Sequence, residues 1–249
     1  LVAAAPAPGA AAPRAWDAEL WAEARVEACR ELRCPGLPEP LLLAEAPERL
    51  GLAGKVWDSA ILLIAQVAAD SVIHAPGPFS VRGRRVLELG AGTGAVGLAC
   101  ARLGAEEVLL TDLAAQLPLL RLNVALLAAQ VVATGSQSLP PVCAAALPWG
   151  SAALEGEHRR SFGAVVLSDV VYDATLHEPL LATLRAVTDG GAPASVLLAQ
   201  RRRFEEDARF FQFASESFAV QRVEPCARAI AELGAACRNV ELYRLRRKG

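Results

Sequence analysis

The amino-acid sequence predicts an α/β fold with a doubly wound, mostly parallel sheet of seven strands. Short apolar strand patterns alternate with helical patterns from about residue 55 onward, and such alternation favours a parallel sheet with helices on both faces. A glycine-rich turn over residues 90–94 directly follows the first of these strands. The last two predicted strands show the polar alternation that is typical of a sheet edge.

Two helical patterns precede the first strand. Residues 15–32 carry apolar side chains at the spacing of one helical face, and prolines follow them. A second helix begins near Trp57 and runs to residue 69, with Asp58 or Ser59 able to cap its first turn. The Pro-Gly-Pro sequence of residues 76–78 ends that unit.

After residue 84, strands and helices alternate. Each predicted strand is a short run dominated by Val, Leu, Ala or Phe, and turn residues separate many of these elements. The strands are predicted at residues 85–89, 107–111, 142–146, 162–167, 195–199, 218–223 and 240–245. The helices between them are predicted at residues 93–103, 114–129, 176–187 and 204–215.

The chain has 249 residues, of which 53% are hydrophobic and 21% are charged. That length suits one α/β domain with a short extension. We expect the domain over residues 55–249, a helical extension over 15–54 and a disordered Ala/Pro-rich tail over 1–14. A formal net charge of -2 gives no overall attraction to nucleic acid or to an anionic membrane.

Cysteine and histidine usage indicates a reduced protein without a metal site. The six cysteines form no C-x-x-C pair, and three histidines leave few ligands for zinc. The apolar stretches fall short of the ~20 residues of a membrane span, and the first residues do not resemble a signal peptide. We therefore expect a monomer in the cytoplasm, with the nucleus as a second compartment, and neither a membrane nor nucleic acid as partner.

The glycine turn lies where a doubly wound sheet binds its ligands, beyond the carboxyl end of a strand. Gly90, Gly92 and Gly94 let the backbone turn sharply and approach a ligand closely, although glycine turns without a ligand are also common. Glu88 is a charged residue in an apolar strand, where burial is costly without a partner. Asp112 ends the next strand, where an acid can accept hydrogen bonds from ribose hydroxyls.

The spacing of the glycines separates the candidate cofactors. Dinucleotide sites use G-x-G-x-x-G, whereas this turn has the sequence G-x-G-x-G. A nucleoside without a pyrophosphate is therefore favoured, and S-adenosyl-L-methionine is the cofactor that we expect. A nicotinamide-dependent oxidoreductase is an alternative on the same fold.

Five short motifs follow one another along the chain. They are W-D at Trp57, E-L-G-A-G-T-G from Glu88, T-D ending at Asp112, W-G at Trp149 and D-V-V-Y from Asp169. Together they resemble the seven-β-strand protein-lysine methyltransferases that act on non-histone proteins, over roughly residues 54–248. The resemblance implies a Rossmann-like fold and methyl transfer from S-adenosyl-L-methionine to a lysine amine. It also implies a substrate such as an Hsp70-type chaperone, valosin-containing ATPase or elongation factor 1A.

The same resemblance implies which residues contact the cofactor. These residues are Trp57, Glu88, Gly90, Ala91, Gly92, Asp112, Trp149 and Ser168. The glycine backbone would contact the amino-acid portion of the cofactor, and Asp112 would contact its ribose. Trp149 would lie near the adenine, and Trp57 would line the pocket.

Asp169 and Tyr172 match the D-x-x-Y motif at the mouth of the family's lysine channel. Methyl transfer to an amine is an in-line displacement, so the protein must align the reactants and favour a neutral amine. Asp169 is expected to bind the ammonium and orient the amine, and Tyr172 to line the channel. The alternatives are that Tyr172 only packs and that Asp169 only caps the next helix, a role that Asp173 could take instead.

Other acceptors and a non-catalytic role stay open from the sequence. Enzymes that methylate base amino groups typically use N/D-P-P-Y/F, whereas Val170 and Val171 replace the prolines here. This favours a protein acceptor, with a small molecule, nucleic acid or a non-catalytic cofactor-binding module as alternatives. The basic run of residues 201–203 is interpreted as a solvated charge run, in preference to a contact with an acidic substrate.

Two segments depart from the family pattern. The segment before Trp57 does not obviously match the family's N-terminal hairpin, and residues 225–238 form a longer stretch than usual. Both segments are therefore candidates for substrate recognition.

Overall fold

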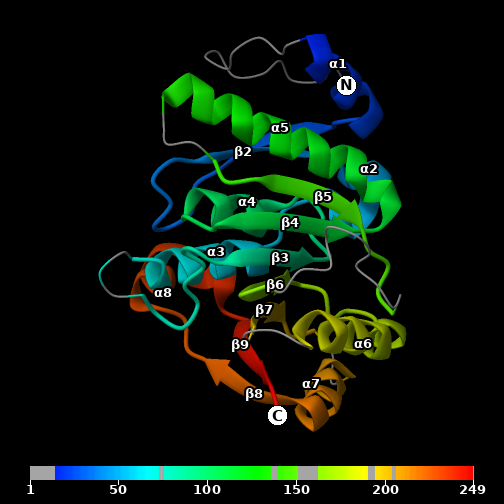
Figure 1. Cartoon of the computed structure of the whole chain (residues 1–249), viewed down its shortest axis with the longest axis vertical. Coiled ribbons are helices and arrows are strands. Elements are labelled where there is room, and N and C mark those ends of the chain that lie inside the picture. The colour runs from blue at the N-terminus through cyan, green and yellow to red at the C-terminus, as the bar shows by residue number, and fades with distance from the viewer. Residues whose placement is uncertain are drawn as a thin grey trace.

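A seven-stranded mixed sheet forms the centre of the computed structural model (Figure 1), which confirms the predicted fold class. The structure describes residues 15–72, 74, 76–135, 139–150, 162–189, 194–203 and 206–248, so the predicted tail lies outside the described residues. The strand order is β5-β4-β3-β6-β7-β9-β8. The strands are β3 Arg85–Leu89, β4 Glu107–Asp112, β5 Val142–Ala146, β6 Ala164–Ser168, β7 Ser195–Arg201, β8 Phe218–Val223 and β9 Val240–Arg247.

The direction of winding reverses between β3 and β6. From β3 the chain moves outward to β4 and β5, then returns to place β6 on the other side of β3, and all these neighbours are parallel. Strands β5 to β7 are parallel, whereas β9 pairs antiparallel with both β7 and β8. The reversal creates a switch point at the carboxyl ends of β3 and β6, where ligands bind in such sheets.

Helices cover both faces because successive side chains of a strand point to opposite sides. Val86 and Val166 pack in one hydrophobic cluster with residues of α3 (Asp58–Asp70) and α4 (Ala95–Arg102). Leu87 and Val165 pack in a second cluster with residues of α6 (His177–Thr188) and α7 (Glu206–Ser217). The strands between them are buried on both faces, which explains their continuous apolar runs.

The predicted helix over residues 15–32 is too long. Helix α1 spans Ala15–Ala24, and Arg25 then adopts a left-handed φ of 48° that interrupts a right-handed helix. Residues Ala28–Leu32 form β1, which pairs antiparallel with β2 (Leu41–Glu45). The segment before Trp57 therefore contains a hairpin after all, followed by the short helix α2 (Pro47–Leu50) and a 3₁₀ turn over Gly51–Gly54.

Helix α5 (Leu117–Thr134) follows a 3₁₀ turn at Ala114–Gln116 and is longer than predicted. Among the described residues, the stretch Ala114–Thr134 is apolar and long enough to cross a membrane by composition, which corrects the expectation that every apolar stretch is too short. In this fold it packs against α1, β2 and β5. Its apolar character therefore has an explanation within the fold.

The long segment before β9 contains an unpredicted helix. Helix α8 (Ala227–Leu233) continues into a 3₁₀ turn at Gly234–Cys237, and both contact α3. The side chain of Gln66 on α3 accepts a hydrogen bond of 2.8 Å from the backbone N–H of Cys226. The segment is therefore attached to the face of the sheet that α3 covers.

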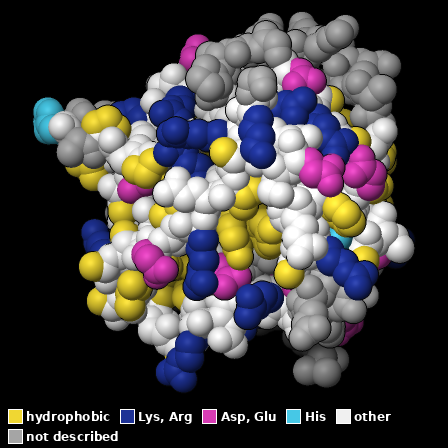
Figure 2. Space-filling view, turned by 90° about the horizontal axis from the view of Figure 1, so that it is seen from below, with side chains coloured by type: hydrophobic (Ala, Val, Ile, Leu, Met, Phe, Trp, Pro, Cys, Tyr) yellow, Lys and Arg dark blue, Asp and Glu magenta, His cyan; other side chains and the backbone are white. Residues whose placement is uncertain are grey.

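The face at the β8 end of the molecule carries mixed charge. Figure 2 shows Lys and Arg side chains there among hydrophobic and acidic ones. Within β8 and β9, Arg222 pairs with Glu241 at 3.3 Å, and Arg247 pairs with Asp189 at 3.1 Å. These arginines are thus partly neutralised by neighbouring acids.

Candidate active site

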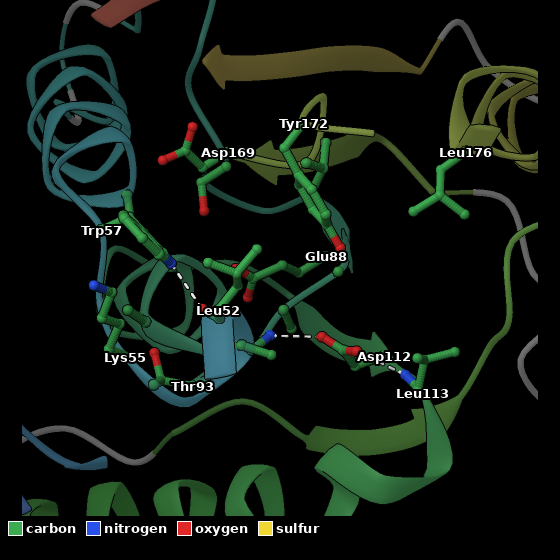
Figure 3. Close-up of a pocket in the computed structure, with 18 of the residues that line it drawn as sticks. Leu52, Lys55, Trp57, Glu88, Thr93, Asp112, Leu113, Asp169, Tyr172 and Leu176 are labelled. Carbon is green, nitrogen blue, oxygen red and sulfur yellow. Dashed lines mark hydrogen bonds between the residues drawn. The ribbon is translucent and has the colours of Figure 1, made fainter. Parts of the chain in front are cut away.

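A pocket of about 480 Å³ opens beyond the carboxyl ends of β3, β4 and β6, at the switch point of the sheet (Figure 3). Its volume lies in the range of sites for small molecules and cofactors. All ten residues that the sequence predicts for the site line this pocket. They are Trp57, Glu88, Gly90, Ala91, Gly92, Asp112, Trp149, Ser168, Asp169 and Tyr172. The structure therefore brings together residues that are more than a hundred positions apart in the sequence.

Glycine is required in the turn by both backbone conformation and close packing. Gly90 and Gly92 have φ values of 64° and 55°, which L-residues with a side chain rarely adopt. A Cβ atom at Gly90 would lie 2.9 Å from Cζ2 of Trp149 and from Cγ1 of Val170. At Gly92 it would lie 2.8 Å from the carbonyl oxygen of Ala53. The turn is therefore packed closely between the floor of the pocket and the segment before α3.

Glu88 has the partner that its burial requires. The residue is 1% exposed, and its carboxyl accepts a 2.7 Å hydrogen bond from the backbone N–H of Gly97 in the first turn of α4. Burial raises the pKa of Glu88 to about 8, and the Gly97 hydrogen bond opposes that rise. Thr111 of β4 donates a 2.7 Å hydrogen bond to the backbone carbonyl of Glu88. Glu88 thus connects β3 to α4 at the base of the pocket.

Asp112 faces the pocket with hydrogen-bonding capacity to spare. Its carboxylate accepts hydrogen bonds from the backbone N–H groups of Gly92 at 2.8 Å and Leu113 at 2.7 Å, as Figure 3 shows. Burial raises its pKa, whereas these two bonds lower it. A carboxylate has about four acceptor positions, so Asp112 can accept further hydrogen bonds from the hydroxyls of a ribose.

Trp57 is fixed as a wall of the pocket. Its indole N–H donates a 2.7 Å hydrogen bond to the carbonyl oxygen of Leu52. The ammonium of Lys55 lies 3.9 Å from the centroid of a Trp57 ring, and the guanidinium carbon of Arg203 lies 5.4 Å from it. These distances fit cation–π contacts. Neither cation was predicted as part of the site.

Tyr172 lies at the mouth of the pocket and is 42% exposed. Burial of its hydroxyl raises the pKa of Tyr172, and the negative charge of Asp112 adds to the rise. The preceding residue, Val171, is held by Gln200 through two hydrogen bonds, at 3.0 Å to its N–H and 2.8 Å to its carbonyl. Gln200 is 1% exposed and orients the D-V-V-Y segment. Sequence reasoning missed it, although a glutamine near the end of an apolar strand was a signal.

Asp169 is already paired. Arg203 donates two parallel hydrogen bonds of 2.8 Å to its two carboxylate oxygens, and the Asp169 side chain is only 3% exposed. Arg201 forms an ion pair with Asp58, while Arg202 is exposed. Residues 201–203 are exposed or half-buried, in keeping with a solvated run, but Arg201 and Arg203 also form ion pairs that the sequence did not indicate. The pairing of Arg203 was missed because its partner is 34 residues away in sequence.

The helix caps differ in part from those that the sequence predicts. Asp173 accepts hydrogen bonds from the backbone N–H and the hydroxyl of Thr175, at 2.9 and 2.7 Å, so it caps the turn before α6. Neither Asp58 nor Ser59 caps α3. Trp57 occupies the N-cap position of this helix, and its side chain makes no capping hydrogen bond. Asp169 is thereby free of a helix-capping role.

Asn123 of α5 is a second residue that sequence reasoning missed. It is fully buried and donates a 2.8 Å hydrogen bond to the carbonyl of Thr93 in the glycine turn. It also bonds the backbone of Ala44 in β2, accepting at 2.7 Å and donating at 3.1 Å. The N-terminal hairpin is therefore tied to the cofactor turn. A lone asparagine within an apolar helix was the available signal.

The residues present fit S-adenosyl-L-methionine. The glycine turn offers backbone in the left-handed region without side chains, so that a ligand in the pocket can approach it closely. Asp112 retains acceptor positions for a ribose, and Pro148 and Trp149 supply an apolar wall for a base. Ser168 ends β6 at the edge of the same pocket.

Comparison with known proteins agrees with this geometry. The sequence pattern of the family described as lysine methyltransferase matches residues 37–217. The protein N-lysine methyltransferase METTL21A of Danio rerio is 34% identical over 181 residues, 73% of this chain and 75% of that protein. The EEF1A lysine methyltransferase 3 of Mus musculus is 35% identical over 66% of this chain and 62% of that protein.

A solved structure shares the fold at low sequence identity. The 16S rRNA methyltransferase of T. thermophilus, in complex with AdoMet and guanosine, has a TM-score of 0.52 and 19% identity, covering 89% of this chain and 50% of that one. Similarity at this level shows a common fold. Family membership follows from the match to the family's sequence pattern over most of the chain and from the 34% identity to METTL21A of Danio rerio over 73% of it. The chain belongs to the lysine methyltransferase family and uses S-adenosyl-L-methionine as its cofactor.

Proposed function

We propose that this protein methylates a lysine of a chaperone, an ATPase of the valosin-containing type or a translation factor, acting as a monomer in the cytoplasm and also in the nucleus. The names of the relatives support a protein acceptor, and one of them carries the name of its substrate, EEF1A. The formal net charge of -2 also favours a protein over nucleic acid. The observation that carries the proposal is the convergence of all ten predicted residues on one pocket.

The half of the pocket that contains the glycine turn, Asp112 and Trp149, called the cofactor half, is proposed to bind and orient S-adenosyl-L-methionine. Asp112 would accept hydrogen bonds from the ribose of the cofactor, the backbone of residues 90–92 would contact its amino-acid portion, and Trp149 would pack against its adenine. The bound cofactor supplies a methyl group that is already activated on a sulfonium. Glu88 and Asn123 hold the turn in the geometry that this contact needs. The protein therefore contributes mainly alignment.

The acceptor half receives the lysine. Trp57 and Tyr172 line the pocket near Asp169, and Leu52 forms an exposed apolar rim, at 52% exposure. Such a channel binds the four-carbon stem of a lysine by apolar contact and disfavours its charged form through desolvation. Leaving water outside also strengthens the contacts that position the amine.

Labelled S-adenosyl-L-methionine tests the proposal directly. The purified protein is incubated with EEF1A, an Hsp70-type chaperone or a valosin-containing ATPase, and transfer of label to a lysine is located by mass spectrometry. We expect one of the three to be labelled. Labelling of no protein, together with a labelled small molecule or nucleic acid from a lysate, would overturn the proposed acceptor.

Two variants show whether the signal arises at this pocket. Asp112→Ala is expected to weaken cofactor affinity by about 10- to 100-fold, because hydrogen bonds to a charged group contribute about 1.5–3 kcal/mol. Asp189→Ala removes an aspartate whose side chain is 61% exposed and pairs only with Arg247 among the contacts described, and should leave cofactor affinity unchanged. Equal affinity in the two variants would remove Asp112 from its proposed role.

A further inference from the structure

The ion pair of Asp169 and Arg203 lies in the wall of the proposed acceptor site. Arg203 donates from both terminal nitrogens at 2.8 Å, and the backbone N–H of Arg201 adds a third hydrogen bond, 3.2 Å to Oδ1 of Asp169. The side chains are 3% exposed for Asp169 and 27% exposed for Arg203. Both carboxylate oxygens are thus engaged before any substrate arrives.

Several elements hold Arg203 in this position. Its backbone N–H donates a 2.9 Å hydrogen bond to Asp207 of α7, and its guanidinium carbon lies 5.4 Å from the centroid of a Trp57 ring. Among the described residues, the charged or titratable groups around the pair include Asp207 on α7, Lys55 beside Trp57 and the Arg201–Asp58 pair at the start of α3. Glu88, Asp112 and Tyr172 line the same pocket, and burial raises the pKa of Glu88 to about 8, so all variants are compared with Glu88 unchanged.

The charge of the pair decides which form of lysine the site favours. A lone carboxylate at this depth would attract the ammonium form of lysine, which has no free electron pair and cannot accept a methyl group. A guanidinium stays protonated in proteins, so Asp169 and Arg203 together carry no net charge. A neutral ion pair in the wall of an apolar channel does not attract the ammonium form of lysine electrostatically.

We propose that Arg203 is a positioning residue for methyl transfer, which neutralises Asp169 so that the acceptor site takes lysine as the neutral amine. This inference rests on the proposed function. The lysine releases its proton to water before or during entry. Its nitrogen then forms the new N–C bond while the C–S bond breaks and the electron pair stays on sulfur, and the extra proton of the product leaves to water.

A charge series tests the inference through the pH dependence of kcat, which reports ionisation within the bound complex, measured between pH 6.5 and pH 10 with saturating amounts of the protein that the wild-type enzyme labels. Arg203→Gln leaves the Asp169 carboxylate without its counter-charge, which raises the pKa of the bound lysine, because nearby charges shift a pKa by about 1–3 units. The acid limb, which is the part of the profile where the rate falls toward low pH, should therefore move up by about one pH unit. Asp169→Asn leaves a bare guanidinium, so the limb should move down. The double variant is neutral again and should return to the wild-type limb, as should Arg203→Lys.

A second measurement needs neither turnover nor a known substrate. The probe is n-butylamine, which matches the lysine side chain from Cβ outward, added to protein saturated with S-adenosylhomocysteine and followed by NMR. We expect Arg203→Gln to bind it about 10-fold more tightly than the wild type at pH 7, where the amine is almost entirely protonated. The double variant should bind it as weakly as the wild type.

The outcomes are distinct from those for the proposed function. If no candidate protein is labelled, the proposed acceptor is wrong, and the n-butylamine series still decides the role of Arg203. If all four variants share one acid limb and one affinity for n-butylamine, with activity merely reduced, Arg203 only supports the fold and the inference is overturned. Affinity for S-adenosyl-L-methionine within threefold of the wild type shows that each variant retains the pocket.

Discussion

The two halves of the pocket are built in different ways. The cofactor half contains hydrogen bonds between backbone N–H groups and acids nearby in the sequence, such as Gly97 to Glu88, nine residues apart, and Gly92 to Asp112, twenty apart, while Asn123 supplies a more distant contact. The acceptor half is held by side chains from distant segments, such as Arg201 and Asp58, 143 residues apart. Glu88 is 1% exposed, whereas Leu52 at the rim is 52% exposed. The difference indicates a rigid cofactor site beside a rim that can vary with the substrate.

The largest effect is expected from Gly90→Ala. The new Cβ would meet Trp149 and Val170 at 2.9 Å, and the left-handed backbone adds about 1–2 kcal/mol of strain. Together with overpacking of about 1–3 kcal/mol, this should lower the free energy of unfolding by about 2–5 kcal/mol and weaken cofactor binding by about 100-fold or more, measured by urea unfolding and calorimetric titration.

A matched control separates strain from packing. Gly135 has a φ of 63°, but nothing lies within 4 Å of a Cβ placed there. Gly135→Ala should therefore show the backbone strain alone and leave cofactor affinity at the wild-type value. If the two variants lost the same stability and affinity, close packing at Gly90 would not distinguish the cofactor half.

Asn123→Ala tests whether the N-terminal hairpin supports the cofactor turn. The change leaves backbone groups of Ala44 and Thr93 without partners in a buried place, which costs about 1–3 kcal/mol for each group. We expect the free energy of unfolding to fall by about 3 kcal/mol and cofactor affinity to fall several-fold. Loss of stability with unchanged affinity would show that the hairpin and the turn are independent.

Glu88→Gln should change how stability depends on pH. The folded-state pKa of Glu88 is raised to about 8 by burial, above its ordinary value of 4.5, so the folded protein binds a proton that the unfolded chain has released. The contribution of this group to stability is therefore greatest below pH 4.5 and is lost as the pH rises through 8. Urea unfolding at pH 5, 6, 7 and 8 should give a flatter decline for the variant, because glutamine does not titrate. An identical slope in both proteins would contradict the raised pKa.

The smallest effect on stability is expected at the rim. Leu52→Ala removes an exposed apolar side chain, so the free energy of unfolding should change by less than about 0.5 kcal/mol. If Leu52 packs on the substrate, KM for the labelled protein should rise about 3- to 10-fold while cofactor affinity stays constant. Val132→Ala, at a 71% exposed position on α5, is the control. Equal KM values for both variants would remove the rim from substrate recognition.

Most of the sheet and of the cofactor half could be predicted from the sequence. The glycine turn, Glu88 and Asp112 lie close together in the chain, and the two strands β3 and β4 that carry the acids have unambiguous apolar patterns, so local reasoning was sufficient. The N-terminal hairpin was missed because residues 28–32 can follow a helical spacing, and only pairing with β2 makes them a strand. Arg203 was missed for a similar reason, since no local pattern indicates that its partner is Asp169, which follows the neighbouring strand β6.

The backbone at Asp169 limits which residues natural variation or protein engineering can place there. Its φ of 56° lies in the left-handed region, where aspartate, asparagine and glycine are tolerated far better than longer or branched side chains. Glutamate keeps the charge, but its longer side chain would place the carboxylate beyond Arg203. It would also have to adopt the same strained backbone conformation. Viable replacements at this position should therefore be confined to a very small set of short side chains. In a saturation library, most substitutions here would be lost because of backbone strain, whatever their effect on methyl transfer.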